Sequence, residues 1–272
     1  MKFLIRDDDC CAFTTVEDIE RCYARIWDIA PANLSVTPFR IPGDDPHIPA
    51  GLIGDTRVMP LGAHGELVHF LREKIAAGKI DVALHGYHHT RPRGRPEYAA
   101  GDDLDSRTRD GKRYLEDLLQ CEVQTFVPPY NTIDAKGFDA IVGAHLNLVG
   151  IPSFWRNSER PFSVANFSRL TTRKFYRSVR GIDYPHVLRF SDHKEVGYVS
   201  LTPAQTLSAI RHQFEGIAAA NGVFVLAVHY HAFDKPLKSG ERIGDVVTML
   251  VEQAAKLPDT RFCSYRQLWS EA

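Results

Sequence analysis

The 272-residue sequence lacks the features that mark several specialised classes of protein. It has no apolar run long enough to span a membrane, and the apolar start Met1 to Ile5 leads into Asp7 without the cleavage site of a signal peptide. Its 33 basic and 34 acidic residues give a formal net charge of -1, so no global field attracts nucleic acid. We therefore expect a cytoplasmic protein without a membrane span or a nucleic-acid partner.

Cysteines are few, and their spacing is unordered. The five of them, an odd number, include no C-x-x-C pair: Cys10, Cys11, Cys22, Cys121 and Cys263. This pattern argues against a disulfide framework and against a zinc module built from cysteines. We expect reduced thiols, most of them packed in the core.

Short apolar runs alternate along the chain with amphipathic stretches, a pattern typical of βα units. The strands expected are near 2–6, 33–37, 80–84, 123–127, 146–150, 223–228 and 261–264. Helices are expected from about residue 16 onwards and at 61–78, 103–120, 134–143, 203–220 and 241–256. No biased linker or internal repeat interrupts the pattern, so the sequence predicts one α/β domain over residues 1–272.

Two stretches do not fit this alternation. Residues 38–60 are rich in Pro, Gly and Asp and are expected to form a long loop over the mouth of the fold. Residues 151–200 show no clean helix and hold nine aromatic residues, with nine basic residues against four acidic ones. This stretch is either an irregular, β-rich insertion that packs its aromatics on the sheet or a substrate-binding wall, with Trp155 in it, suited to sugars or anionic groups.

Polar clusters follow four of the expected strands. They are Asp7 to Asp9, His85 to His89, Pro128 to Asn131, and the pair His229 and His231. Because the carboxyl ends of parallel strands meet on one face, these four clusters are expected to form a single site.

The histidine cluster favours a metal site. His85 and His89 are four residues apart, and two imidazoles with one carboxylate leave a position open on a catalytic Zn²⁺. The carboxylate would come from the Asp7 to Asp9 triplet, whose neighbouring side chains point to opposite sides of an extended segment and cannot all serve one ion. The alternative for the triplet is an acidic turn that caps the next helix.

In this order the motifs resemble the polysaccharide deacetylase (NodB-homology) family of carbohydrate esterases, in particular a divergent branch of inferred deacetylases. The family's first motif is Thr-Phe-Asp-Asp-Gly, and Arg6-Asp7-Asp8-Asp9-Cys10 stands in its place. The resemblance implies that Asp8 is the catalytic base and Asp9 a metal ligand. A register one residue earlier would give these roles to Asp7 and Asp8.

The other motifs carry further roles by the same resemblance. His-Ser/Thr-x-x-His is similar to residues 85–89, which implies His85 and His89 as ligands and His88, with Tyr87, near the substrate. Arg-x-Pro-Tyr-Gly is similar to residues 127–131, which places the backbone N–H of Tyr130 in the oxyanion hole and Pro129 and Asn131 beside the substrate. Leu-x-Leu-His is similar to residues 226–229 and implies His229 as the general acid, with His231 sharing that role or contacting substrate.

The sequence also departs from the family pattern. Cys10 and Asn131 replace glycines, and the arginine that orients the catalytic aspartate is missing from the third motif. Arg6, Arg156 or Arg189 could replace it. No clean match to the remaining family motif exists, although Asp183 and Asp192 are candidates.

The resemblance implies a single-domain distorted (β/α) barrel of about seven parallel strands, with an irregular insertion at 151–200. It implies a hydrolase that removes an acyl group, N-acetyl in the first place, from a sugar or glycan. The expected cofactor is Zn²⁺, with Co²⁺, Ni²⁺ or Mn²⁺ as alternatives. Two rival hypotheses are an amidohydrolase for a C–N bond outside sugars and a carbohydrate-binding relative without turnover. A cytoplasmic enzyme would act on a soluble or lipid-linked precursor, and the sequence leaves its oligomeric state open.

Overall fold

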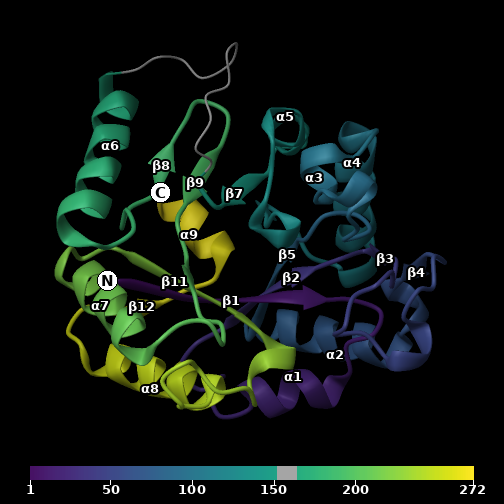
Figure 1. The fold of residues 1–272 in the computed structure, drawn as a ribbon, viewed down its shortest axis with the longest axis horizontal. Helices are drawn as coiled ribbons and strands as arrows, with labels where there is room; N and C mark the ends of the chain where they lie inside the picture. Colours follow the sequence, from purple (N-terminus) through teal and green to yellow (C-terminus); the bar gives the residue numbers. More distant parts are fainter. Residues whose placement is uncertain (152–163) are drawn as a thin grey trace.

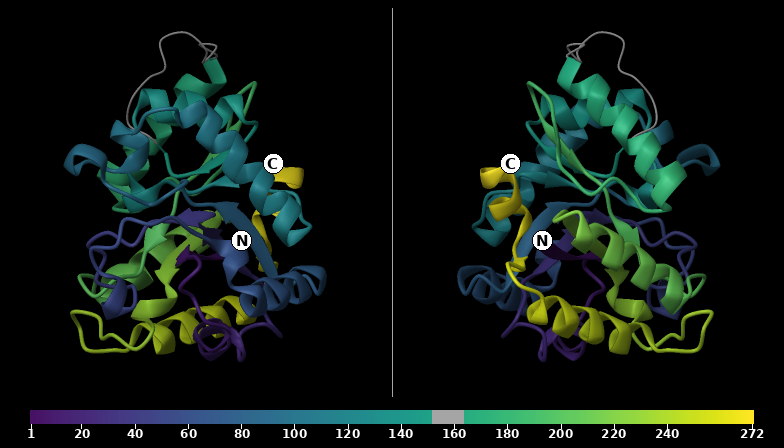
Figure 2. Two further views of the ribbon diagram at one scale, coloured as in Figure 1. Left: turned by 90° about the vertical axis from the view of Figure 1, so that its right-hand side faces the viewer. Right: turned by 90° about the vertical axis from the view of Figure 1, so that its left-hand side faces the viewer.

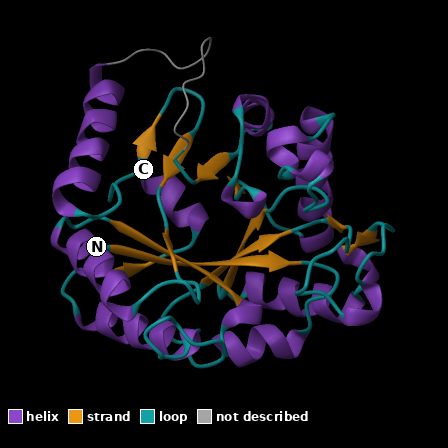
Figure 3. Cartoon of the chain, viewed as in Figure 1, coloured by secondary structure: helices purple, strands orange, loops and turns teal. Residues whose placement is uncertain are grey.

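The computed structural model describes residues 1–151 and 164–272. A mostly parallel sheet forms its centre (Figures 1 and 3). Across this sheet the order is β10 (Val199–Ser200), β11 (Val223–His229), β1 (Lys2–Cys10), β2 (Ala32–Val36), β5 (Ile80–Leu84), β6 (Thr125–Phe126), β7 (Asn147–Val149), β9 (Lys194–Val196) and β8 (Leu188–Arg189), with β12 (Arg261–Phe262) paired to β1. Only β8 runs antiparallel to its neighbour among these described strands. Each strand expected from the sequence is therefore confirmed.

The two ends of the sheet are joined by a very short link. β9 pairs with β7 near one end of the order and β10 pairs with β11 at the other, yet only Gly197 and Tyr198 separate β9 from β10. Two residues span no more than about 7 Å of extended chain. The sheet is thus curled round until its ends meet, as in a distorted barrel.

Helices surround the sheet, as the two side views show (Figure 2). They are α1 (Val16–Tyr23), α2 (Gly65–Ala76), α3 (Glu97–Ala100), α4 (Leu104–Leu119), α5 (Ala135–Gly143), α6 (Val164–Phe175), α7 (Leu207–Ala219), α8 (Ile243–Lys256) and α9 (Tyr265–Glu271). Helices α2 and α4 pack on β5, α5 on β7 and α7 on β11. In the described part of the chain, none of the helices has both the length and the apolar character needed to cross a bilayer.

Strand β1 shows how alternation sorts side chains between the two sides of the sheet. Phe3 and Ile5 join the large core under the outer helices, while Leu4 joins an inner cluster. That inner cluster contains Tyr265, Leu268 and Trp269, so α9 covers the barrel at the amino-terminal ends of the strands. Arg6 and Asp8 share the side of Leu4, because side chains two residues apart on a strand point the same way. The functional residues therefore lie inside the barrel, at the opposite end from α9.

The structure corrects two expectations for helices. Helix α7 begins at Leu207 with Thr206 as its N-cap, so residues 203–206 are a turn rather than the first turn of the helix. The stretch 151–200 contains helix α6 and the short strands β8, β9 and β10, of which β10 completes the sheet. Consecutive β-branched residues, Thr171 and Thr172, weaken the helical signal of α6 in the sequence. The expected loop at 38–60 includes a small hairpin of β3 (Phe39–Arg40) and β4 (Met59–Pro60).

Candidate metal centre

The three aspartates at the end of β1 have three different surroundings. Asp9 has φ = 75°, and the pairing of β1 with β2 shifts register between Asp7 and Cys10. A bulge of this kind turns the strand and re-aims a side chain, and strained backbone of this kind is common at functional sites. The bulge lets Asp8 and Asp9, although adjacent, both face the same cavity.

Asp7 points the other way and is part of the core. It is 1% exposed, accepts a hydrogen bond from the Tyr23 hydroxyl at 2.6 Å, and accepts another from the Tyr230 backbone N–H at 2.8 Å. Burial raises the pKa of Asp7 well above its usual value, against the effect of these two hydrogen bonds. Asp7 therefore ties α1 to the turn that carries the carboxy-terminal histidines. Its carboxylate does not line the cavity that Asp8 and Asp9 face, which argues against the earlier register.

Asp8 is held by Arg6. The Arg6 Nε donates to Asp8 Oδ1 at 2.8 Å, its Nη2 donates to Asp8 Oδ2 at 2.6 Å, and Nη2 also donates to Asn131 Oδ1 at 2.6 Å. Burial alone would raise the pKa of Asp8, but the charge of Arg6, with that of His85, lowers it to about 2. Of the three arginines that could replace the family's arginine, Arg6 has the contacts, whereas Arg189 is exposed and Arg156 lies outside the described residues.

Asp9 lies between two pairs of histidines. Its Oδ1 is 3.3 Å from His85 Nε2 and 3.0 Å from His89 Nε2, and its Oδ2 is 3.6 Å from His229 Nε2 and 3.2 Å from His231 Nε2. Burial would raise the pKa of Asp9, but the charge of His89 and hydrogen bonds from the histidines hold it well below its usual value. A carboxylate ringed by imidazoles is the donor set expected for a divalent transition metal.

The orientation of His85 supports this assignment. Its Nδ1 lies 2.9 Å from the carbonyl oxygen of Val127, which can only accept, so Nδ1 carries the hydrogen. A protonated ring would donate a hydrogen bond from Nε2 to Asp9 Oδ1, whereas a neutral ring directs the Nε2 lone pair at this oxygen. Two acceptors at that separation repel unless a cation or a proton lies between them. Asp9, His85 and His89 thus fit a metal ion. Asp9, His229 and His231 form a second group, and in each group the possible ligand atoms lie within 4.8 Å of one another.

The segment that carries His85 and His89 is fixed by a buried carboxylate that the sequence did not identify. Glu97 is fully buried, and its side chain accepts hydrogen bonds from the backbone N–H groups of Tyr87, His88 and His89 at 3.0 to 3.2 Å. Gly86, with φ = 69°, permits this close approach, because a Cβ there would be 2.4 Å from Pro129 Cγ. Glu97 therefore sets the path of the chain between the two ligands.

Tyr130 and Asn131 both have left-handed backbone, with φ of 56° and 53°. Asparagine tolerates this conformation better than most residues, which explains how Asn131 stands where the family has glycine. Within the described residues no hydrogen bond uses the Tyr130 N–H, so this donor is free to bind a ligand. The Tyr130 ring packs on His89, with centroids 4.5 Å apart.

A cavity of about 820 Å³ contains the site and brings together most of the residues expected from the sequence. Those that line it are Asp8, Asp9, His85, His89, Tyr130, Asn131, His229 and His231. Residues 41–47 form another wall, as expected for a loop over the mouth of the fold, and His47 stacks on His231 with centroids 3.9 Å apart.

Three of the residues expected beside the substrate, His88, Tyr87 and Pro129, do not line this cavity. The His88 Nδ1 lies 2.7 Å from the Phe39 carbonyl oxygen, and Tyr87 packs on the Phe39 ring with centroids 4.9 Å apart. Pro129 fills the space beside Gly86. Trp155 lies outside the described residues.

Comparisons with solved structures identify the fold. The structure of an inferred polysaccharide deacetylase from Mycobacterium smegmatis matches with a TM-score of 0.54 and 12% identity, over 99% of this chain and 89% of that one. A structure named T48 deacetylase with substrate matches with a TM-score of 0.50 and 12% identity, over 99% of this chain and 91% of that one. The chain has the fold of the polysaccharide deacetylases. No family model and no curated protein matches the sequence, so the distorted (β/α) barrel is confirmed by structure alone.

Proposed function

We propose that the protein is a metal-dependent hydrolase that removes an acyl group, N-acetyl in the first place, from a sugar or glycan. The observation that carries this proposal is the position of Asp9 between His85 and His89, with Asp8 beside it and paired to a buried arginine. The fold neighbours, both named as deacetylases, support the choice of a sugar amide as substrate.

Asp9, His85 and His89 would hold the metal, with zinc as the expected ion. A divalent ion bound there supplies a Lewis acid and lowers the pKa of water in contact with it. His85 is kept in the required tautomer by its Nδ1 hydrogen bond to Val127.

The protein's own groups then account for the proton transfers. Asp8 is ionised at neutral pH, so its carboxylate accepts the proton of the water that attacks the amide carbon. The free N–H of Tyr130 donates to the oxygen of the tetrahedral intermediate, a contribution of about 2.7 to 4 kcal/mol for a well-placed donor. His229 stands next to Asp8 across the β1–β11 pair, and its Nε2 donates the proton that lets the amine leave as the C–N bond breaks.

The arrangement weakens the binding-protein alternative. That hypothesis drew its support from the missing arginine, and Arg6 now occupies the place beside Asp8. A protein that only bound glycan would need neither this ionised base nor an imidazole opposite it.

The test is metal content by mass spectrometry and acyl release from N-acetylated sugars, on protein purified without chelator. We expect about one zinc-like ion in the wild type, loss of metal and activity in His85→Ala and Asp9→Ala, and loss of activity alone in His229→Ala. His69→Ala, on an exposed part of α2, serves as the control and should change neither. Full metal occupancy in His85→Ala would reject the site, and loss of metal in His229→Ala would make that residue a ligand. Release from non-sugar amides alone would favour the amidohydrolase alternative.

A further inference from the structure

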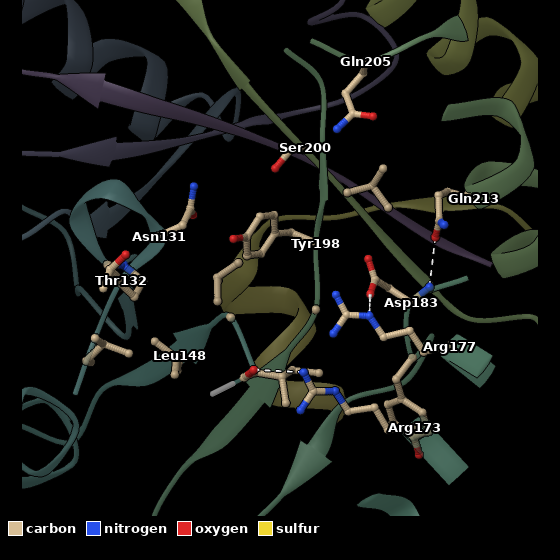
Figure 4. Close-up of a pocket in the computed structure, with 18 of the residues that line it drawn as sticks. Asn131, Thr132, Leu148, Arg173, Arg177, Asp183, Tyr198, Ser200, Gln205 and Gln213 are labelled. Carbon is tan, nitrogen blue, oxygen red and sulfur yellow. Dashed lines mark hydrogen bonds and ion pairs between the residues drawn. The ribbon is translucent and has the colours of Figure 1, made fainter. Parts of the chain in front are cut away.

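A second cavity, of about 650 Å³, adjoins the metal centre (Figure 4). Its walls come from the segment after β6, from α6 and the turn that follows it, from the β9–β10 link and from α7. Asn131 lines both this cavity and the one that holds the metal centre. The two cavities are therefore neighbours that share Asn131 as part of their walls.

The boundary between the two cavities involves Arg6, the residue that holds Asp8. Arg6 donates to Asn131 Oδ1, and its guanidinium carbon lies 4.4 Å from the centre of the Tyr198 ring. In Figure 4, Asn131 comes from the segment after β6, and the Tyr198 ring extends toward it from the β9–β10 link. The two residues thus separate the Arg6–Asp8 pair from the second cavity, and a substrate that reacts beside Asp8 would place its remaining part against them.

The opposite side of the second cavity carries the positive charge of Arg173. Its Nη2 donates to the backbone oxygen of Ile151 at 3.0 Å, and within residues 1–151 and 164–272 no carboxylate forms an ion pair with it. Partial burial lowers the pKa of Arg173, and the positive charge of Arg177 lowers it further; the negative charges of Glu195 and Asp183 oppose this shift without cancelling it. A partly desolvated charge next to a like charge is unfavourable unless an anion compensates it.

The other charged groups that line the cavity leave a net positive charge there. Arg177 is largely exposed and lies 3.9 Å from Asp183 Oδ1, so one carboxylate faces two guanidinium groups. The Gln213 side chain accepts from the Asp183 backbone N–H and donates to the Gly181 carbonyl, which fixes this part of the wall. Guanidinium groups bind phosphate and carboxylate oxygens through paired hydrogen bonds.

We propose that this second cavity binds an anionic group, a phosphate or a carboxylate, that is attached to the acylated sugar. The substrate class is then an acidic sugar, such as a sugar phosphate or a nucleotide-linked sugar, rather than a neutral polymer. The inference rests on the proposed function for the reacting end of the substrate. The anion site itself rests only on the charges and contacts of the second cavity.

The test measures equilibrium binding by calorimetry, with pyrophosphate as the probe of the anion site. Wild-type protein should bind it, and Arg173→Gln should bind it at least about 10-fold more weakly, as expected when one charge-assisted contact is lost. Arg173→Lys keeps the charge and should retain most of the affinity, so a folding defect can be told from a loss of charge. Lys174→Gln removes a charge from the next, exposed position of α6 and should bind like the wild type. Equal affinities in wild type and Arg173→Gln would overturn the proposal.

The substrate class is tested with matched sugars. N-acetylglucosamine 1-phosphate and N-acetylmuramic acid are compared with neutral N-acetylglucosamine, and at least one anionic sugar should bind about 10-fold more tightly through Arg173. The anionic sugar that binds more tightly shows whether the site prefers phosphate or carboxylate. Equal binding of neutral and anionic sugars together with acetate release would reject the anion site and leave the proposed function. Binding that depends on Arg173 without acetate release would support the anion site and reject the proposed function.

Discussion

Arg6 and Asp8 are in contact because side chains alternate between the two faces of strand β1. They are two residues apart on β1 and therefore point to the same side, into the barrel, where both are almost fully buried. The same alternation sends Asp7 to the outer core. These positions could have been read from the sequence, because the period of two selects Arg6 over more distant arginines once Asp8 is chosen.

The Arg6–Asp8 contact predicts the effect of replacing Arg6. Arg6→Gln leaves the Asp8 carboxylate buried without its partner, which should reduce the free energy of unfolding by about 3 to 5 kcal/mol. Acyl release should fall as well, because the orientation of Asp8 is lost. Urea denaturation and initial rates measure the two effects. Arg189→Gln, on the exposed side of β8, is the matched control. An unchanged denaturation midpoint in Arg6→Gln would mean that the pair contributes nothing to stability.

The bulge at Asp9 could not be predicted from the sequence. Simple alternation places adjacent side chains on opposite sides, and only the shift of register between Asp7 and Cys10 brings Asp9 to the side of Asp8. The resemblance to known motifs gave the roles of Asp8 and Asp9, while the physical reason for their shared direction came from the backbone.

Among the elements, those with strong periodicity were predictable and those defined by tertiary contacts were not. Strands β1, β2, β5 and β11 are apolar runs with little ambiguity, and their ends located the site. Short elements such as α3 and α9 went unpredicted, although Ser264 and Gln267 form a capping box at the start of α9. The buried carboxylate of Glu97 in α3 looks in the sequence like any surface glutamate, since its hydrogen-bond donors are backbone N–H groups of the preceding loop, which no sequence pattern marks.

A prediction for α3 follows from those contacts. Glu97→Gln places an amide group where the carboxylate accepts three N–H groups, so the loop between His85 and His89 should lose its fixed path. We expect metal affinity to fall by about 10- to 100-fold, as for other groups that orient metal ligands. Competition titration with a chromophoric chelator measures the affinity, and Glu73→Gln, an exposed change on α2, should leave it unaltered. A wild-type affinity in Glu97→Gln would show that the ligands are positioned without this carboxylate.

For the whole molecule, the site joins strands from both halves of the chain, so a bound ion should stabilise the entire barrel. Asp9 and His85 come from the first third of the sequence, and His229 and His231 from the last. At a free metal concentration of about 100 times Kd the gain is about 2.7 kcal/mol. The chain's fold class was predictable from its repeated βα pattern, whereas its closure depends on the β9–β10 link, which no periodicity marks.

The corresponding prediction concerns chelation. Treatment with EDTA should lower the thermal midpoint by several degrees, and added Zn²⁺ should restore it, as measured by differential scanning calorimetry. His85→Ala should show no such response, whereas His69→Ala should respond like the wild type. A midpoint that is the same with and without chelator in the wild type would indicate that the folded protein holds no ion.

The central place of β1 bears on how the chain is synthesised. This first strand pairs with β11 and β12, which lie near the carboxyl terminus, as well as with β2. A nascent chain can pair β1 with β2 early, but the other edge of β1 stays open until residues 223–229 have left the ribosome. Asp8 and Asp9 therefore lie beside an unpaired strand edge for most of translation, and chains that end before β11 are expected to aggregate through this edge.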